Sequence, residues 1–457
     1  MIHKMCALEC LTMIECKYRK SEVPVMMYRK FYEVIRKWER DQEQKPLMVI
    51  GARQVGKTWL MKKFCQDVYH DYVYINLEER NDIASVFDGS LDPEMILMKI
   101  SQLFGRTVDE KTPMFFDEIQ CCERAVTSMK YFCESEKNYR ILCAGSLLGV
   151  KMRRFHSSFP VGKVHIVQMY PLDFEEFLLA CGEDLLRDGI RNAYVQKAPL
   201  AQGIHEKALH LYQDYLYVGG MPEAVQSYLD HGKNALAVDS VIYDNLQLAY
   251  LADMTKYVTS PQESFKITQV YHSVPRQLAK ENPKFQYSQV RSGGNRRDFS
   301  EPLDWLDASG MVYAVHSLQA PLPPLKSYED DSSFKIYLSD VGLLRHMCGL
   351  HYRDLLMESQ NIYKRAVTEN YVIQQLKAAG IRMYYYKPSP SMEIDLILDL
   401  AEQIIPVEIK SGRHKRSTSL QNYRNKYHPV FAVRISALNF GWQDDLFSVP
   451  LYAVWCI

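Results

Sequence analysis

The sequence has no excess of either charge, because its 457 residues include 55 basic and 55 acidic side chains. A strongly basic chain would indicate a nucleic-acid or membrane partner, so any binding surface of one sign must be local here. The sequence also lacks an uninterrupted apolar run near the roughly 18 residues that cross a bilayer. We therefore expect a soluble chain without a membrane partner.

Paired metal-binding cysteines are missing as well. The eleven cysteines are scattered, and the closest groupings, Cys6 with Cys10 and Cys121 with Cys122, lack the C-x-x-C spacing of zinc modules. The apolar stretch Ala7 to Ile14 does not predict a secretion signal, because acidic residues interrupt it and no small-residue cleavage site follows. Reduced thiols and a cytoplasmic location are expected.

Short apolar runs alternate with helical stretches in the first third of the chain. A helix is expected over Tyr28 to Trp38, where apolar residues recur at helical spacing. The expected strands are Leu47 to Ile50, Val73 to Leu77, Met114 to Phe116, Ile141 to Ala144 and Val164 to Val167. This alternation predicts an α/β fold with a parallel sheet covered on both faces and ligands beyond the carboxyl ends of its strands.

The remainder of the chain divides into three regions. Long helices such as Leu209 to Val218 follow Pro171, and then short helical segments lead to the apolar pieces Met311 to Val315 and Lys335 to Leu338, which is typical of a winged helix. The last hundred residues, with a helix and then strands, indicate a separate α/β module. The expected boundaries are an N-terminal extension at 1–27, a P-loop core at 28–178, a helical region at 179–263, a winged-helix-like region at 264–350 and a C-terminal domain at 351–457.

A phosphate-binding loop stands directly after the first expected strand. Residues 51–58 read GARQVGKT and fit G-x-x-x-x-G-K-[ST], with a helix expected from Trp59. Backbone N–H groups would face phosphate oxygens, Lys57 would reach the β- and γ-phosphates, and Thr58 would offer a hydroxyl to Mg²⁺. The expected ATP-binding residues are Gly51, Ala52, Arg53, Gln54, Val55, Gly56, Lys57, Thr58 and Trp59.

Two carboxylates end the apolar strand that begins at Met114. This pattern is typical of a Walker B motif, in which Asp117 holds the magnesium shell and Glu118 polarises the attacking water. Ser146 follows the next strand and is either a contact of the γ-phosphate or a cap of the helix that follows. Arg153 and Arg154 are candidates for a charge-stabilising arginine or are simply solvated.

A second set of charged residues lies among the apolar residues of the C-terminal strands. Glu408 and Lys410 are two apart and therefore share one face of a strand, while Asp395 belongs to the preceding strand. Asp395 and Glu408 would hold a divalent metal with Glu369 of the preceding helix, and Lys410 would activate water or stabilise phosphate charge. This is the pattern of a metal-dependent nuclease, but an edge strand with outward Glu and Lys looks similar. The basic residues 413–416 would grip a phosphate backbone or form a solvated face.

The order of these motifs resembles a prokaryotic AAA-like ATPase family. The residues that carry the resemblance are the P-loop at 51–58, FDEIQ at 116–120, AGS at 144–146, PLDFEEF at 171–177 and GGMP at 219–222. The C-terminal half, with PRQL at 275–278, EID at 393–395 and PVEIKSG at 406–412, is similar to the uncharacterised domain usually fused to that ATPase. Where members often carry Gly-Arg, this chain has Gly162-Lys163, which puts an arginine-finger role there in doubt.

The resemblance implies an AAA core, a helical and winged-helix-like middle and a terminal domain similar to the restriction-endonuclease fold. The leading hypothesis is a Mg²⁺-dependent ATPase whose nucleotide state controls a C-terminal module. This module would act on DNA or other nucleic acid and is a candidate nuclease. The alternative is an ATP-regulated switch in which an inactive nuclease-like domain contacts a protein partner or a second copy of the chain. A small-molecule kinase would need an acceptor-binding lid, for which we find no signature.

Overall fold

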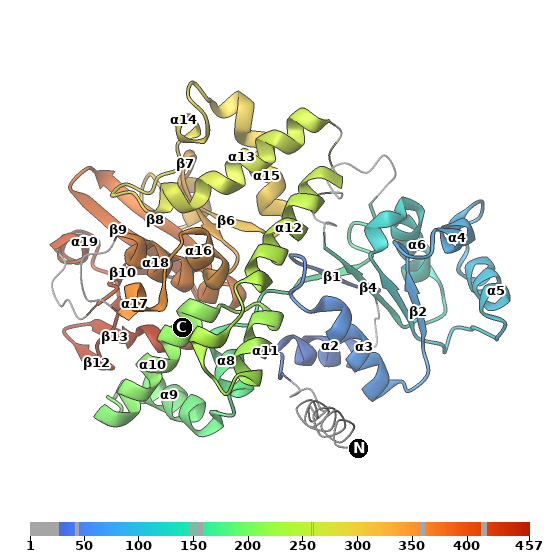
Figure 1. Cartoon of the computed structure of the whole chain (residues 1–457), viewed down its shortest axis with the longest axis horizontal. Helices are drawn as coiled ribbons and strands as arrows, with labels where there is room; N and C mark the ends of the chain where they lie inside the picture. Colours follow the sequence, from blue (N-terminus) through green and yellow to red (C-terminus); the bar gives the residue numbers. More distant parts are fainter. Residues whose placement is uncertain are drawn as a thin grey trace, which may run out of the picture.

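The computed structural model describes residues 27–41, 45–146, 150, 159–256, 258, 260–356, 362–412 and 418–457. Two β-sheets lie in the two halves of the elongated molecule, and a group of helices fills the space between them (Figure 1). None of the helices in these residues combines the length and apolar character that a membrane span needs.

The first sheet is parallel and has the strand order β2-β3-β4-β1-β5. Its strands are β1 (Leu47–Ile50), β2 (Val73–Asn76), β3 (Met114–Asp117), β4 (Ile141–Gly145) and β5 (His165–Gln168). The accompanying helices are α2 (Phe31–Arg40), α3 (Lys57–Val68), the short α4 (Asn81–Ala84), α5 (Pro93–Phe104) and α6 (Glu123–Glu134). The expected parallel sheet is thereby confirmed.

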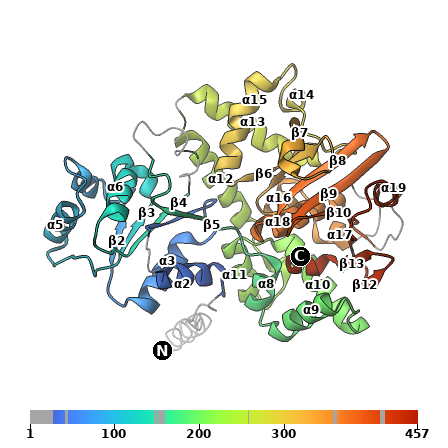
Figure 2. The same cartoon turned by 180° about the vertical axis from the view of Figure 1, so that it is seen from behind.

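Alternating side chains of this sheet enter two separate cores. Val49 packs with Phe64 of α3 and Ile35 of α2, whereas Met48 packs with the residues of α5 and α6 on the opposite face. Helices therefore cover both faces, so ligands reach the sheet only at its edges. Figure 2 shows α5 and α6 on one side of the sheet and α2 and α3 on the other.

A helical region joins the two sheets. It contains α8 (Phe174–Ala180), α9 (Asp184–Gln196), α10 (Gln202–Val218), α11 (Pro222–Asp230) and α12 (Val241–Lys256). The chain continues with α13 (Pro261–Leu278), α14 (Tyr287–Val290) and α15 (Arg296–Ala308), and the antiparallel ribbon of β6 (Val312–Leu318) and β7 (Glu329–Leu338) follows.

The second sheet is mixed and has the order β12-β13-β11-β10-β9-β8-β6-β7. Its remaining strands are β8 (Arg382–Ser389), β9 (Met392–Leu400), β10 (Gln403–Ile409), β11 (Ala432–Ser436), β12 (Gly441–Gln443) and β13 (Leu446–Pro450). The helices α16 (Val341–Met347), α17 (Tyr352–Leu356), α18 (Ile362–Ala378) and α19 (Thr418–Tyr427) belong to the same part of the chain. Apolar side chains of α18 pack on one face, and Leu420 and Tyr423 of α19 pack on the other.

The ribbon of β6 and β7 is part of this second sheet and is not a free wing. β6 pairs in parallel with β8 through Ser317 with Tyr385 and Leu318 with Tyr386. The ribbon and the C-terminal strands were expected in separate regions, and in the structure they share one sheet. One hydrophobic cluster also runs from Val49 of β1 to Val407 of β10, so the two halves share a core.

Candidate functional site

The P-loop lies between β1 and α3, at the carboxyl edge of the first sheet. Gly51 has φ +147°, and a Cβ added there would lie 2.3 Å from the carbonyl oxygen of Met169. Gly56 has φ +96°, in the left-handed region where side chains other than hydrogen are strained. The two glycines are therefore required by the backbone path that precedes α3.

Lys57 is buried in this loop and folds back on it. Its Nζ donates to the carbonyl oxygens of Gly51 at 2.9 Å and Ala52 at 2.8 Å. Burial lowers the pKa of Lys57 to about 8, although the nearby charges of Glu118 and Asp117 act to raise it. The ammonium therefore has two weak acceptors that a phosphate oxygen could replace.

The Walker B carboxylates lie beside the start of α3. The Thr58 hydroxyl donates to Asp117 Oδ2 at 2.9 Å, and the Tyr74 hydroxyl donates to the same oxygen at 3.1 Å. Burial raises the pKa of Asp117, and so does the charge of Glu118, while the two hydroxyls lower it. A hydroxyl and a carboxylate of this kind are hard oxygen donors that suit Mg²⁺.

Glu118 is held in an unusual backbone conformation at the end of β3. Its φ of +48° lies in the left-handed region, which is rare for a residue with a side chain. Its Oε2 accepts a short hydrogen bond from Gln120 Nε2 and lies 3.4 Å from the Ser146 hydroxyl. Gln120 was not singled out as a site residue in the sequence, although it stands in the quoted FDEIQ motif.

The outer residues of the P-loop contact other elements. Arg53 forms an ion pair with Asp253 of α12, which is buried, and Gln54 adopts φ +64° at the turn. Burial raises the pKa of Asp253, while Arg53 lowers it. Asp253 belongs to the helical region, so this loop also contacts a part of the chain that its motif does not cover.

A cavity of about 280 Å³ opens beside Gly56. It is lined by Met27, Arg29, Gly56, Trp59, Leu172, Pro222, Glu223 and Gln226. The walls are largely apolar, and Trp59 is 48% exposed at the mouth of the loop. Only Gly56 and Trp59 were predicted as binding residues. The GGMP motif that ends in Pro222 was visible in the sequence, but its nearness to the P-loop was not.

The C-terminal charged residues gather around Lys335 of β7, which is 1% exposed. Lys335 Nζ lies 2.9 Å from Glu369 Oε1 of α18 and 2.9 Å from Glu393 Oε1 of β9. Glu369 also accepts a short hydrogen bond from Tyr337. Burial acts to raise the pKa of Glu393, but Lys335 and Lys387 outweigh it and lower that pKa to about 2.

Asp395 and Glu408 lie next to this group. Asp395 Oδ2 accepts from the backbone N–H of Ile409 at 2.7 Å. Desolvation raises the pKa of Asp395 to about 7, with further contributions from the negative charges of Glu408 and Glu369. Glu408 forms a close ion pair with Lys410 through Oε1, and its Oε2 is buried without a hydrogen-bond partner among the described residues.

These carboxylates do not form a compact set of three ligands. Within the described part of the chain, the one group of three candidate ligand atoms that all lie within 4.8 Å of one another comes from His316, Glu329 and Asp331. The metal role of Glu369, Asp395 and Glu408 therefore stays a prediction. Lys335, which neutralises Glu369, was missed because its strand belongs to the region assigned to a winged helix.

Several predicted residues fall elsewhere. Arg153 and Arg154, the basic residues 413–416 and the N-terminal extension up to residue 26 lie outside the described residues. Lys163, at the position in doubt for an arginine finger, forms an ion pair with Glu134 at 3.1 Å.

Three segments of the chain match models of protein families. Residues 43–178 match the model described as an AAA domain. This segment is an AAA-type P-loop domain. Residues 209–354 match a domain of unknown function (DUF8612), and residues 364–453 match a second domain of unknown function (DUF4143). The likeness of the C-terminal part to restriction endonucleases stays a prediction.

The solved structures that match this chain share little sequence with it. A Walker-type ATPase of Pyrococcus abyssi, PABY2304, is 13% identical over 70% of this chain and 96% of its own, with a TM-score of 0.44. The ORC2 protein of Aeropyrum pernix, in its ADPNP and ADP complexes, is 12% identical over 76% of this chain and 96% of its own, with a TM-score of 0.37. A search of curated proteins finds no match.

Proposed function

We propose that the AAA domain binds ATP with Mg²⁺ at the P-loop and hydrolyses it with Glu118. The observation that carries the proposal is the grouping of Lys57, Thr58, Asp117 and Glu118 at the carboxyl edge of a parallel sheet. A protein catalyses phosphoryl transfer mainly by positioning the reacting groups and by stabilising the charge of the transition state.

Each of these side chains has a separate task. Lys57 leaves its two carbonyl acceptors and donates to the β- and γ-phosphates. Thr58 and Asp117 would hold Mg²⁺, which neutralises phosphate charge when it is bound. Glu118 keeps Oε2 on Gln120, so Oε1 is the oxygen that accepts a proton from the attacking water.

The cavity beside Gly56 suits the base of the nucleotide. Its walls of Met27, Trp59 and Pro222 offer apolar and aromatic surface for a flat ring, and the polar ends of Glu223 and Gln226 reach its rim. The base would then contact residues from both sides of the AAA match, including α11 of the helical region.

Calorimetric titration with ATP and Mg²⁺, followed by measurement of released phosphate, tests the proposal. Binding of ATP in about the micromolar to millimolar range, with release of phosphate, is expected. A protein that is folded but shows neither heat of binding nor phosphate release would contradict it.

A second candidate function is metal-dependent cleavage of nucleic acid by the C-terminal sheet. Burial raises the pKa of Asp395 and the charge of Glu408 adds to this, while Glu408 Oε2 is a buried acceptor without a partner among the described residues, as a free metal ligand would be. Lys410 lies beside Glu408, where its ammonium would stabilise the negative charge of a phosphate.

The alternative is a switch that contacts a protein partner, and the pairing of both Glu369 and Glu393 with the buried Lys335 fits it. Incubation with DNA and RNA in Mg²⁺ or Mn²⁺, with and without ATP, separates the two. Cleavage that disappears in Lys410→Ala while ATP hydrolysis persists supports the nuclease. Intact nucleic acid under all conditions supports the switch.

A further inference from the structure

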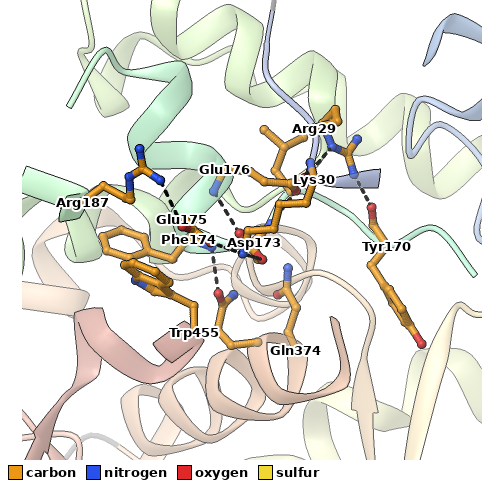
Figure 3. Close-up of polar contacts among 12 residues, drawn as sticks. Arg29, Lys30, Tyr170, Asp173, Phe174, Glu175, Glu176, Arg187, Gln374 and Trp455 are labelled. Atoms are coloured by element: carbon orange, nitrogen blue, oxygen red, sulfur yellow. Dashed lines mark hydrogen bonds and ion pairs between the residues drawn. The ribbon is translucent and has the colours of Figure 1, made fainter. Parts of the chain in front are cut away.

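Arg29 connects the P-loop with the segment that leaves the first sheet. It precedes α2, lies outside the AAA match and is 5% exposed. Its Nη1 donates to the carbonyl oxygen of Val55 at 2.8 Å, and its Nη2 donates to that of Tyr170 at 2.6 Å. Its Nε donates to Glu176 Oε1 at 3.2 Å (Figure 3). One buried guanidinium therefore joins the nucleotide loop to α8.

The start of α8 continues this connection toward the second sheet. Asp173 and Glu176 form a capping box, in which Glu176 N–H donates to Asp173 Oδ1 at 2.9 Å and Asp173 N–H donates to Glu176 Oε2 at 3.2 Å. The next backbone N–H, that of Phe174, donates to Gln375 Oε1 of α18 at 2.7 Å. Figure 3 shows this group with Gln374 of the same helix below it.

Arginine is the side chain that these acceptors require. Burial raises the pKa of Glu176, and the Arg29 charge lowers it, so the guanidinium stabilises a carboxylate that would otherwise be costly to bury. The planar guanidinium reaches three acceptors in different directions, whereas a lysine ammonium at the same place would not reach all of them.

The loop that Arg29 contacts also holds the carbonyl oxygens that accept from Lys57. In the structure, the carbonyl oxygens of Gly51 and Ala52 both accept from Lys57 Nζ. If Lys57 turns to phosphate as proposed above, these carbonyls would lose hydrogen bonds, and the loop between Ala52 and Gly56 would adjust. Val55, which Arg29 contacts, lies inside that stretch.

We propose that Arg29 is a positioning residue that sets the P-loop for ATP and transmits the nucleotide-dependent adjustment through Glu176 and Phe174 to Gln375 on α18. The proposal rests on the proposed ATP binding. α18 also carries Glu369, so the helix that receives the signal reaches into the charged group of the second sheet. The nucleotide site and the charged group of the second sheet would therefore be coupled through the contact between α8 and α18.

Three variants of the full chain, Arg29→Lys, Lys30→Ala and Gln375→Ala, test this proposal. Arg29→Lys keeps a cation beside Glu176 but cannot span the three acceptors, so the link between the P-loop and α8 loses at least one of its hydrogen bonds. Lys30→Ala removes the neighbouring cation, which pairs with Asp173 and Glu175, and leaves the P-loop contact in place. ATP affinity is measured by calorimetry, and amide hydrogen exchange of α18 is measured with and without saturating Mg·ATP.

The wild type and Lys30→Ala should bind ATP equally and show the same ATP-dependent change in exchange at α18. Arg29→Lys should bind ATP roughly tenfold more weakly and lose that change even at saturation. Gln375→Ala should keep the affinity and lose the change, which a merely structural role of Arg29 does not explain.

Other outcomes overturn the proposal. An unaltered exchange response in Arg29→Lys or in Gln375→Ala would show that the signal does not take this route, and so would wild-type protein that binds ATP without any response at α18. An equal loss in Lys30→Ala would assign the effect to the acidic cluster as a whole. Wild-type protein that does not bind ATP would instead refute the proposed function.

Discussion

The charge of Lys57 depends on pH near neutrality because its side chain is buried. Because burial lowers its pKa to about 8, the free protein loses this charge as the pH rises through that value. ATP prefers the charged form, so affinity should be full below about pH 7 and roughly tenfold lower at pH 9. Calorimetric titrations at several pH values measure the change. Lys57→Arg, which does not titrate in this range, should show a flat profile, and a flat wild-type profile would contradict the expectation.

Removal of the Lys57 side chain should have a larger effect than its loss of charge. Lys57→Ala should abolish measurable ATP binding, because the P-loop lysine is the group expected at the β- and γ-phosphates and Arg53, the other cation of the loop, is paired with Asp253. The same titration checks it. Normal turnover in this variant would refute the assignment of the P-loop.

Glu118 is expected to act on water and not on ATP binding. Glu118→Gln keeps the shape of the side chain but removes the carboxylate, so ATP should bind with nearly unchanged affinity while hydrolysis falls by about two orders of magnitude or more. Released phosphate is measured under saturating ATP. Glu79→Gln, at an exposed position of the same domain, is the matched control. Unchanged hydrolysis would mean that another carboxylate activates the water.

At the scale of single elements, β7 determines the state of the C-terminal charges. Lys335→Met would leave Glu369 and Glu393 buried without their shared cation, and breaking a buried pair of this kind costs about 3–5 kcal/mol. Urea unfolding of the full chain measures the loss. Lys387→Met, which removes a more exposed partner of Glu393, should cost about 1 kcal/mol or less. Equal midpoints for both variants would contradict the role given to Lys335.

The ion pair of Lys335 with Glu393 also makes the free energy of unfolding depend on pH in the acidic range. The folded pKa of Glu393 is about 2, below its ordinary value of 4.5, so its ionisation stabilises the fold above that ordinary value. This contribution should disappear as the pH falls from about 4.5 toward 2. Urea midpoints measured across this interval should fall less steeply in Lys335→Met than in the wild type, because the cation that lowers the pKa is gone.

Elements with a strong local pattern could be predicted from the sequence, and their long-range pairings could not. β1 and the P-loop were expected at the residues where they occur, because an apolar run before G-x-x-x-x-G-K-[ST] has few other readings. The pairing of β6 with β8 joins residues almost seventy positions apart, and no local signal records it. Lys335 was therefore read as part of a ribbon, although its ammonium lies among the predicted carboxylates.

At the scale of the whole molecule, the boundary expected at residue 350 should not separate two folding units. Val367, Tyr371 and Leu376 of α18 are fully buried in the cluster that also contains residues of the first sheet. Chains of residues 1–350 and 351–457 would each expose this surface, so neither should unfold cooperatively on heating, whereas the full chain should. Circular dichroism follows the transitions. A sharp transition in either piece would restore the boundary as a structural one.

The nucleotide site could be predicted only in part from the sequence, because residues from distant parts of the chain line it. The P-loop residues were predicted from one motif, but the cavity beside Gly56 needs Met27, which lies 24 residues before the motif, and Pro222, which lies 164 residues after it. Such a site exists only in the folded chain. The helical region therefore contributes to the nucleotide site as well as connecting the sheets.

The exposed indole of Trp59 gives the chain an optical reporter at this cavity. Of the five tryptophans, Trp38, Trp305 and Trp455 are buried, and the other partly exposed one, Trp442, lies in the second sheet with Lys197 over its ring at 3.4 Å. Buried indoles emit at shorter wavelengths than exposed ones, so red-edge emission should come mainly from Trp59 and Trp442. A purine base stacked on Trp59 would quench that emission, and unlabelled nucleotides could be compared in a single cuvette by the fluorescence of the protein itself.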